Sequence, residues 1–387
     1  MTVDRRTVLA GGLAGGGLAA GGLAAGGLAA GLAASPARAD ASAYEAALDA
    51  TFAETKPVAL AGGVVTREGL AWAGTRGVRK AGGAEAVTLD DRWHLGSNTK
   101  AMTAALYGRL VEQGRARWDA PLGELFPGAT IDPAWAGATI RDFMRHRAGV
   151  KDADALGMVF FMTARADARP LTEQRRAIAE RILAAPPTGT RGAYEYANAN
   201  YILAGAAIER ITGQSWEDVM RAELYEPLGL TSGGFGAPPQ DANGGANAWG
   251  HRWGGATQTP IDPADPLSDN PAALGPAGTA HMTLADYATW LKVFLTDGAG
   301  WLKPETIAML TDPAGQAGQP YALGWISLPN APWAGGRVLA HEGSNTMWHA
   351  VAAVGPAKGA AFIGLANVSM EAGAANGLIP GLARARG

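Results

Sequence analysis

Ser97 and Lys100 are the first residues whose types and spacing could do chemistry. On a helix, side chains three residues apart share a face, so the Ser97 hydroxyl and the Lys100 ammonium would lie close together. A serine hydroxyl is a weak nucleophile until a nearby base removes its proton, and a desolvated lysine can be that base. Of the seven lysines, only Lys100 has a serine three positions before it. The pair indicates nucleophilic catalysis; the alternative is an exposed helix lysine behind a capping serine.

Tyr196 and Asn198 form the second candidate set. Tyr196 is the only one of the eight tyrosines with an asparagine two residues on. A phenol beside a lysine cation can have its pKa lowered, and it can carry a proton between Ser97 and a leaving group. The Asn198 amide could fix Lys100 and orient substrate. The structural alternative is a core tyrosine followed by a helix-capping asparagine.

The third candidate set is His341-Glu342-Gly343-Ser344, at the end of a predicted strand. His341 could orient substrate, and Gly343 allows substrate to approach the backbone closely. The backbone N–H groups of Ser344 and Ser97 would form a two-donor oxyanion hole. The alternative is a strand-end turn with an exposed histidine.

The elements that must position these residues differ between the middle and the ends of the chain. Helices are predicted at 41–55, from Ser97 to Gly114, from about 198 to 213 and from about Met370 onward, with short helices capped by Thr139, Ser215 and Thr283. Strands are predicted at 58–66, 70–78, 321–328, 337–341, 347–354 and 361–368. We therefore expect an α+β fold, in which an antiparallel sheet formed by the N- and C-terminal strands is flanked by helices and joined to a mainly helical lobe. A crevice between the two parts is the expected place for the site.

Residues 233–280 are rich in Gly, Pro, Asn and Asp and have no periodic pattern. Loops of that length are usually functional or disordered. The segment contains Ser268-Asp269-Asn270, which is interpreted as a turn without a catalytic role, because Tyr196 and Asn198 already fill the second motif.

The first 39 residues have the pattern of an export signal. Arg5-Arg6 precedes an uncharged, Gly-, Ala- and Leu-rich stretch at 7–34, and Ala37-Arg38-Ala39 gives a small-x-small cleavage pattern. This resembles a twin-arginine signal, so the expected partner is the twin-arginine export machinery and the expected location is the periplasm or outside the cell. Cleavage would leave a single hydrolase domain, residues 40–387. A retained transmembrane anchor is the alternative.

Composition narrows the chemistry further. The 387-residue chain has a net charge of −3 and so lacks the excess of positive charge that is typical of nucleic-acid-binding proteins. It has no cysteine, which excludes thiolate catalysis, Cys-ligated zinc and disulfides. His146, His251, His281 and His349 lack metal-ligand spacing, so neither a metal nor another cofactor is expected. The expected ligand is a small-molecule ester, amide or peptide.

In this order, the three motifs resemble those of the serine β-lactamase and penicillin-binding protein superfamily, on its class C-like, esterase-like His-x-Gly branch. That resemblance implies a β-lactamase/transpeptidase-like fold with Ser97 as the acylated residue. The chain departs from the β-lactamase pattern because it has no Lys-Thr-Gly: His341 stands in place of the lysine and Glu342 in place of the threonine.

Together these features predict an exported serine hydrolase that acts on small esters or amides through an acyl-enzyme. Whether Lys100 or Tyr196 is the general base stays open. A class C-like β-lactamase or D-alanyl-D-alanine carboxypeptidase is the alternative, followed by a non-catalytic penicillin-binding module. Small neutral esters are expected to be better substrates than β-lactams, because a β-lactam carboxylate favours a fixed cation that His341 does not supply near pH 7.

Overall fold

A computed structural model describes residues 41–240, 246–255, 257–315 and 318–387. The predicted signal peptide, residues 1–39, lies outside these described residues. No helix in the described ranges is long and apolar enough to cross a membrane.

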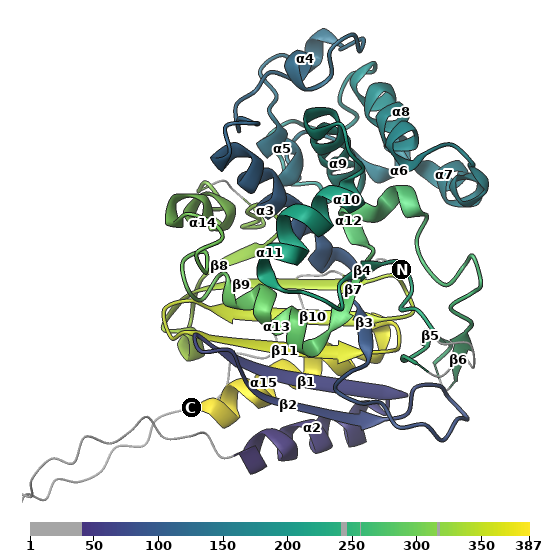
Figure 1. Cartoon of the computed structure of the whole chain (residues 1–387), viewed down its shortest axis with the longest axis vertical. Coiled ribbons are helices and arrows are strands. Elements are labelled where there is room, and N and C mark those ends of the chain that lie inside the picture. The colour runs from purple at the N-terminus through teal and green to yellow at the C-terminus, as the bar shows by residue number, and fades with distance from the viewer. Residues whose placement is uncertain (1–40, 241–245, 256, 316–317) are drawn as a thin grey trace, which may run out of the picture.

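A six-stranded antiparallel sheet joins the two ends of the chain (Figure 1). Its strands are β1 (Ala59–Thr66), β2 (Leu70–Gly77), β8 (Ile326–Ala331), β9 (Gly336–Ser344), β10 (His349–Gly355) and β11 (Ala360–Ala366), in the order β2-β1-β11-β10-β9-β8. The N-terminal hairpin meets the C-terminal strands where β1 pairs with β11, with Leu60 opposite Ala366. The predicted α+β class, with a sheet built from both chain ends, is confirmed.

Helices cover both faces of the sheet. Gly62 and Gly63 are consecutive in β1 and so face opposite sides. A Cβ on Gly62 would lie 2.8 Å from Leu378 of α15 (Ala374–Arg386), and a Cβ on Gly63 would lie 2.9 Å from Leu284 of α13 (Leu284–Lys292). Both glycines therefore let a helix approach the sheet closely. The first helix, α2 (Ala41–Thr55), packs beside α15 at the bottom of Figure 1.

The middle of the chain forms the helical lobe at the top of Figure 1. Its helices are α3 (Thr99–Glu112), α4 (Leu122–Leu125), α5 (Ile140–Met144), α6 (Asp152–Ala155), α7 (Gly157–Thr163), α8 (Leu171–Leu183), α9 (Ala199–Thr212) and α10 (Trp216–Met220). Three further helices follow later in the chain: α11 (Glu226–Leu228), α12 (Gly275–Gly278) and α14 (Pro304–Thr311). Ser215 caps α10 and Thr283 caps α13, as the sequence predicts.

Two predicted strand boundaries are wrong. The strand expected at 321–328 begins only at Ile326, because Gly324 takes φ +85° and packs against α3, where a Cβ would lie 2.4 Å from Ala101 Cα. The strand expected at 337–341 is longer, so His341 lies within β9 rather than at its end.

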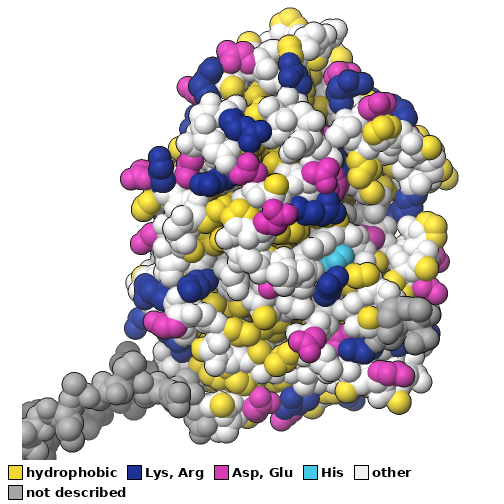
Figure 2. Space-filling model, in the orientation of Figure 1, with side chains coloured by type: hydrophobic (Ala, Val, Ile, Leu, Met, Phe, Trp, Pro, Cys, Tyr) yellow, Lys and Arg dark blue, Asp and Glu magenta, His cyan; other side chains and the backbone are white. Residues whose placement is uncertain are grey.

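The long segment 233–280 holds more structure than its composition indicates. It contributes β4 (Gly234–Phe235), β5 (Gly250–Trp253) and β6 (Gln258–Ile261). A small sheet of order β3-β7-β4 joins it to β3 (Arg92–His94), the strand that precedes Ser97, through β7 (Ala280–Thr283). On the face shown in Figure 2, acidic and basic side chains are interspersed.

Candidate active site

Ser97 lies in a single helical turn, Gly96–Asn98, directly before α3. Gly96 has φ +51°, a backbone conformation that favours glycine. The buried Asn98 amide donates to the carbonyls of Leu95 and Ala350, at 3.0 and 3.1 Å, and so ties the turn to β10. The candidate nucleophile is therefore held by rigid backbone.

Lys100 and Tyr196 converge on the Ser97 hydroxyl. Lys100 Nζ lies 2.9 Å from Ser97 Oγ, and the Tyr196 hydroxyl lies 2.8 Å from it. Lys100 is fully buried and also donates to Asn198 Oδ1 at 2.8 Å and to the Ala277 carbonyl at 2.6 Å. An ammonium has three N–H donors, and these three acceptors match them. The two motifs, 96 residues apart in sequence between Lys100 and Tyr196, thus form one cluster.

The cluster can move a proton. Both Lys100 and Tyr196 are within hydrogen-bond distance of Ser97 Oγ, as a general base must be. Lys100 Nζ also lies 4.9 Å from the centre of the Tyr196 ring. The geometry fits either residue as the base.

Asp152 of α6 holds Asn198 in place. The Asn198 backbone N–H and side-chain amide both donate to Asp152 Oδ2 at 2.9 Å, and the Ala199 N–H donates to Oδ1 at 2.9 Å. A carboxylate at a helix N-terminus is favourable, because it accepts hydrogen bonds that the first turn leaves unmade. Since the amide NH₂ is committed to Asp152, the Asn198 carbonyl oxygen is directed at Lys100.

His341 is buried and held by two neighbours. Its Nδ1 lies 2.7 Å from the Glu342 carbonyl and its Nε2 lies 2.9 Å from the Tyr321 hydroxyl. A carbonyl oxygen only accepts, so Nδ1 carries the proton and Nε2 accepts from Tyr321. Burial raises the pKa of Tyr321 well above its usual value, so this phenol keeps its proton. The network therefore favours a neutral His341.

Glu342 gives the site a fixed negative charge. Burial favours its neutral acid, but contacts with His349 and Asn376 outweigh this and lower the pKa of Glu342 to about 2. Asn376 of α15 donates to Glu342 Oε2 at 3.0 Å, and His349 Nε2 lies 3.5 Å from the same oxygen. The carboxylate thus points toward α15 and β10, although the residue also lines the cavity beside Ser97.

The Ser97 turn and β9 are in backbone contact. A Cβ on Gly343 would lie 2.4 Å from the Ser97 nitrogen, and a Cβ on Gly96 would lie 2.4 Å from the Ser344 nitrogen. Only glycine fits at either position. The two amides that the sequence suggests as oxyanion donors, those of Ser97 and Ser344, therefore flank this contact.

A cavity of about 330 Å³ opens over Ser97. Its lining combines predicted site residues with residues that the sequence did not single out: Ser97, Phe161, Tyr194, Tyr196, Asn198, Asn270, Leu274, Ala277, Gly278, Gln319, Tyr321, Ile326, His341, Glu342, Ser344 and Met370. Within the described chain, none of the lining residues is lysine or arginine. Polar groups thus gather around Ser97, and Phe161, Leu274, Ile326 and Met370 supply apolar wall.

His146 packs against the ring of Tyr196. Its ring centre lies 4.3 Å from that of Tyr196, and its Nδ1 accepts the Ala197 N–H at 3.2 Å. Burial, and then the positive charge of Lys100, lower the pKa of His146 well below its usual value. His146 is therefore a neutral packing residue. In the part of the chain that the structure describes, no group of three or more side chains is arranged to hold a metal ion.

Several site residues carry no sequence signal of their own. Asp152 and Tyr321 belong to no motif, and the Ala277 carbonyl is a backbone group that composition cannot single out. Asn270 is different. The Ser268-Asp269-Asn270 segment is a turn, as expected, but it lies at the site, where Asn270 lines the cavity. The Ser-Asp-Asn pattern was the one sequence feature that could have indicated that Asn270 lies at the site.

Comparison with known proteins gives a consistent result. Residues 44–383 match the family model described as Beta-lactamase. "Unguisins hydrolase ungD'" of Aspergillus campestris is 28% identical over 301 residues, 73% of this chain and 54% of that protein. Penicillin-binding protein 4 of Amycolatopsis lactamdurans is 30% identical over 224 residues, 57% of this chain and 55% of that protein. The chain spans about half the length of these curated relatives.

A solved structure supports the fold. EstCE1, described as a hydrolase with promiscuous acyltransferase activity, aligns with a TM-score of 0.72 at 16% identity, over 89% of this chain and 98% of that chain.

Proposed function

The chain belongs to the Beta-lactamase family, and from that premise we propose that it cleaves small esters or amides through a covalent acyl-enzyme on Ser97. The observation that carries this proposal is the pair of contacts that Lys100 and Tyr196 make with Ser97 Oγ, beside an open cavity. A hydroxyl with two proton-transfer groups in contact can become a nucleophile. The hydrolase names of the relatives add support.

The proposed reaction has two balanced halves. Ser97 Oγ forms a bond to the substrate carbonyl carbon while its proton passes to Lys100 or Tyr196. The N–H groups of Ser97 and Ser344 stabilise the oxyanion. The bond to the leaving group then breaks, and the leaving group takes up the proton. In the second half, water attacks the acyl carbon while its proton passes to Lys100 or Tyr196. The bond to Ser97 Oγ then breaks, Ser97 takes up the proton, and the acid is released.

The cavity favours neutral substrates over anionic ones. His341 is held neutral by Tyr321 and a backbone carbonyl, so it gives a substrate carboxylate no cation. The ionised Glu342, whose carboxylate is turned toward Asn376, adds negative charge near the cavity. Apolar side chains such as Phe161 and Leu274 suit the acyl or alcohol part of an ester.

A β-lactamase or D-alanyl-D-alanine carboxypeptidase is the second candidate, favoured by the match to a penicillin-binding protein. A non-catalytic module would have no need of the buried Ser97–Lys100 contact.

Kinetics on one preparation test this proposal. We expect kcat/KM for p-nitrophenyl butyrate to exceed that for nitrocefin by about tenfold or more, since one missing charge-assisted hydrogen bond costs about 1.5–3 kcal/mol. Ser97→Ala is the control and should be inactive on both. A kcat/KM for nitrocefin equal to or above that for the ester would contradict the proposal and favour a β-lactamase.

A further inference from the structure

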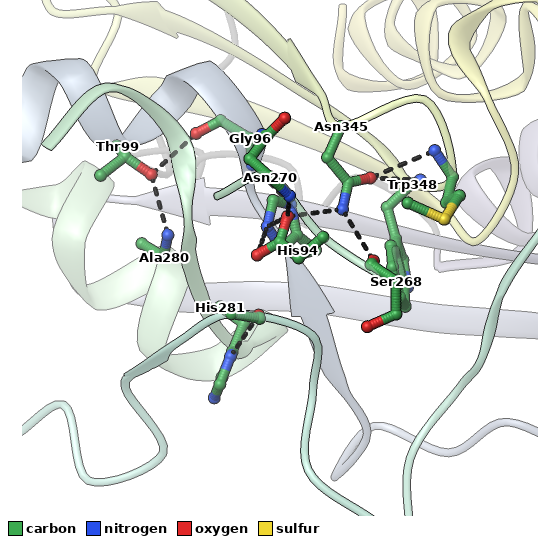
Figure 3. Close-up of polar contacts among 12 residues, drawn as sticks. His94, Gly96, Thr99, Ser268, Asn270, Ala280, His281, Asn345 and Trp348 are labelled. Atoms are coloured by element: carbon green, nitrogen blue, oxygen red, sulfur yellow. Dashed lines mark hydrogen bonds and ion pairs between the residues drawn. The ribbon is translucent and has the colours of Figure 1, made fainter. Parts of the chain in front are cut away.

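A buried polar cluster lies next to the turn that carries Ser97, and Figure 3 shows two of its members, His94 and Asn345. Its members are His94 at the end of β3, Asp269 in the Ser268–Asn270 turn, and Asn345 after β9. His94 is 1% exposed, Asn345 4% and Asp269 8%. None of the three is among the residues that line the cavity. The acyl-transfer steps above do not use them.

His94 links Asp269 to the backbone of the Ser97 turn. Its Nδ1 accepts the Gly96 N–H at 3.1 Å, so the ring proton must be on Nε2. Nε2 lies 3.0 and 3.1 Å from the two Asp269 carboxylate oxygens. The carboxylate therefore selects the tautomer that holds Gly96. Gly96 directly precedes Ser97, whose N–H is the first proposed oxyanion donor.

Asn345 links the same carboxylate to the end of β9. Its amide Nδ2 donates to Asp269 Oδ1 at 2.8 Å. Its Oδ1 accepts the N–H groups of Met347 and Trp348, each at 3.1 Å, and so fixes the turn between β9 and β10. Asn345 directly follows Ser344, whose N–H is the second proposed donor.

Asp269 is thus shared by two side chains, and each of them holds the backbone next to one donor. The segments that it joins are already pressed together at Gly96 and Gly343. A small displacement of either would change the distance between the two N–H groups. Such a change matters because donors stabilise an oxyanion only when both reach it. Burying a carboxylate is costly, and a cost of this kind is sometimes retained for geometric specificity.

We propose that Asp269 is a positioning residue that sets the spacing of the two oxyanion donors, acting through His94 on the Ser97 side and through Asn345 on the Ser344 side. The proposal rests on the proposed acyl-enzyme function.

The test is a set of kinetic comparisons on folded enzyme. Asp269→Asn removes the negative charge and replaces one of the two acceptor oxygens with an NH2 donor, whereas His94→Asn keeps an acceptor near Gly96 and cannot reach Asp269. We expect each to lower kcat for p-nitrophenyl butyrate by about 10–100-fold, the range that follows a loss of alignment or of one donor. KM should change little, and the inhibition constant of phenylboronic acid, whose tetrahedral adduct occupies the oxyanion hole, should rise by a similar factor. Rates are expressed per active site that a fluorophosphonate titrates.

Two further variants make the result decisive. Asp265→Asn alters a carboxylate in the same loop that bonds only locally, to the Leu267 N–H, and should behave as the unmodified enzyme. The Asp269→Asn/His94→Asn double variant should be no slower than the slower single one, because the two residues act as a unit. If Asp269→Asn does not fold, His94→Asn and Asn345→Ala, which leave the carboxylate in place, carry the same comparison.

An unchanged kcat per titrated site with lower stability would show a purely structural cluster and overturn the proposal. So would unaltered boronic acid inhibition alongside a lower kcat. An unmodified enzyme that neither labels at Ser97 nor cleaves the ester would instead overturn the proposed function, so the two failures are distinct.

Discussion

At the scale of single residues, the proposed chemistry depends on how Lys100 is surrounded. It is fully buried, and its three hydrogen-bond acceptors come from three different parts of the chain: Ser97, Asn198 and the Ala277 carbonyl. Burial of a lysine is expensive unless its donors are satisfied. The three acceptors satisfy these donors, and one N–H points at Ser97 Oγ.

Asp152 should matter to catalysis although it does not contact Ser97. We expect Asp152→Ala to lower kcat for an ester by about tenfold, because Asn198 loses the partner that orients its carbonyl toward Lys100. It should also cost about 1 kcal/mol of stability through the lost cap of α9. Ester kinetics and urea unfolding measure the two effects.

The matched control is Asp154→Ala, in the same short helix and exposed. It should leave both quantities unchanged. A stable Asp152→Ala enzyme with full kcat would show that the cap does not orient Asn198 for the reaction.

These residues also mark what the sequence could predict. The sequence identified two pairs of residues by their spacing. Lys100 is the only lysine with a serine three positions before it, and Tyr196 is the only tyrosine with an asparagine two positions after it. Asp152 is one of many acidic residues, and its partners are backbone N–H groups 46 and 47 positions away. No local pattern carries that information.

At the scale of helices and strands, the sequence predicted elements with a periodic apolar pattern well and predicted the structure of loop segments poorly. The helix expected at 41–55 and the one expected at about 198–213 are found with nearly the same bounds. In the first, Tyr44, Leu48 and Thr51 are buried at helical spacing, and the second ends at Gly213, which takes a left-handed conformation. The start of β8 was wrong because the packing of Gly324 on α3, a tertiary contact, decides it. The 233–280 segment gave no pattern because its strands are only 2 to 4 residues long, and β4 pairs with the distant β7 although β5 and β6 pair with each other.

Strand geometry also settles a question that the sequence left open, namely which way Glu342 faces. In β9 its carboxylate reaches α15 through Asn376, while the neighbouring His341 reaches Tyr321. Successive residues of a strand point to opposite faces, so this division is expected once the register is known. The register with β10, in which His341 is opposite Ala352, could not be read from sequence.

At the scale of the whole molecule, the site forms where the sheet meets the helical lobe (Figure 1). The lobe contributes Tyr196 and Asn198, the sheet contributes His341 and Ser344, and Ser97 joins them. The sequence predicted a crevice between the two parts because strands come from the chain ends and helices from the middle. It could not predict that the Ser268–Asn270 turn would lie against the backbone next to Ser97, to which His94 links it.

We also propose that this enzyme is exported by a twin-arginine signal and works in the periplasm or outside the cell. The support is the sequence of residues 1–39 alone. N-terminal sequencing of protein recovered outside the cytoplasm should begin at Asp40. Membrane-bound protein that retains residues 8–34 would indicate an anchor instead.

The central claim is that Ser97 is the nucleophile, and covalent labelling tests it most directly. The purified enzyme is treated with a fluorophosphonate, and its intact mass and its peptides are then measured. We predict one adduct per chain, on the peptide that contains Ser97, and no adduct on Ser97→Ala under the same conditions. An adduct on any other residue, or undiminished labelling of Ser97→Ala, would contradict the account.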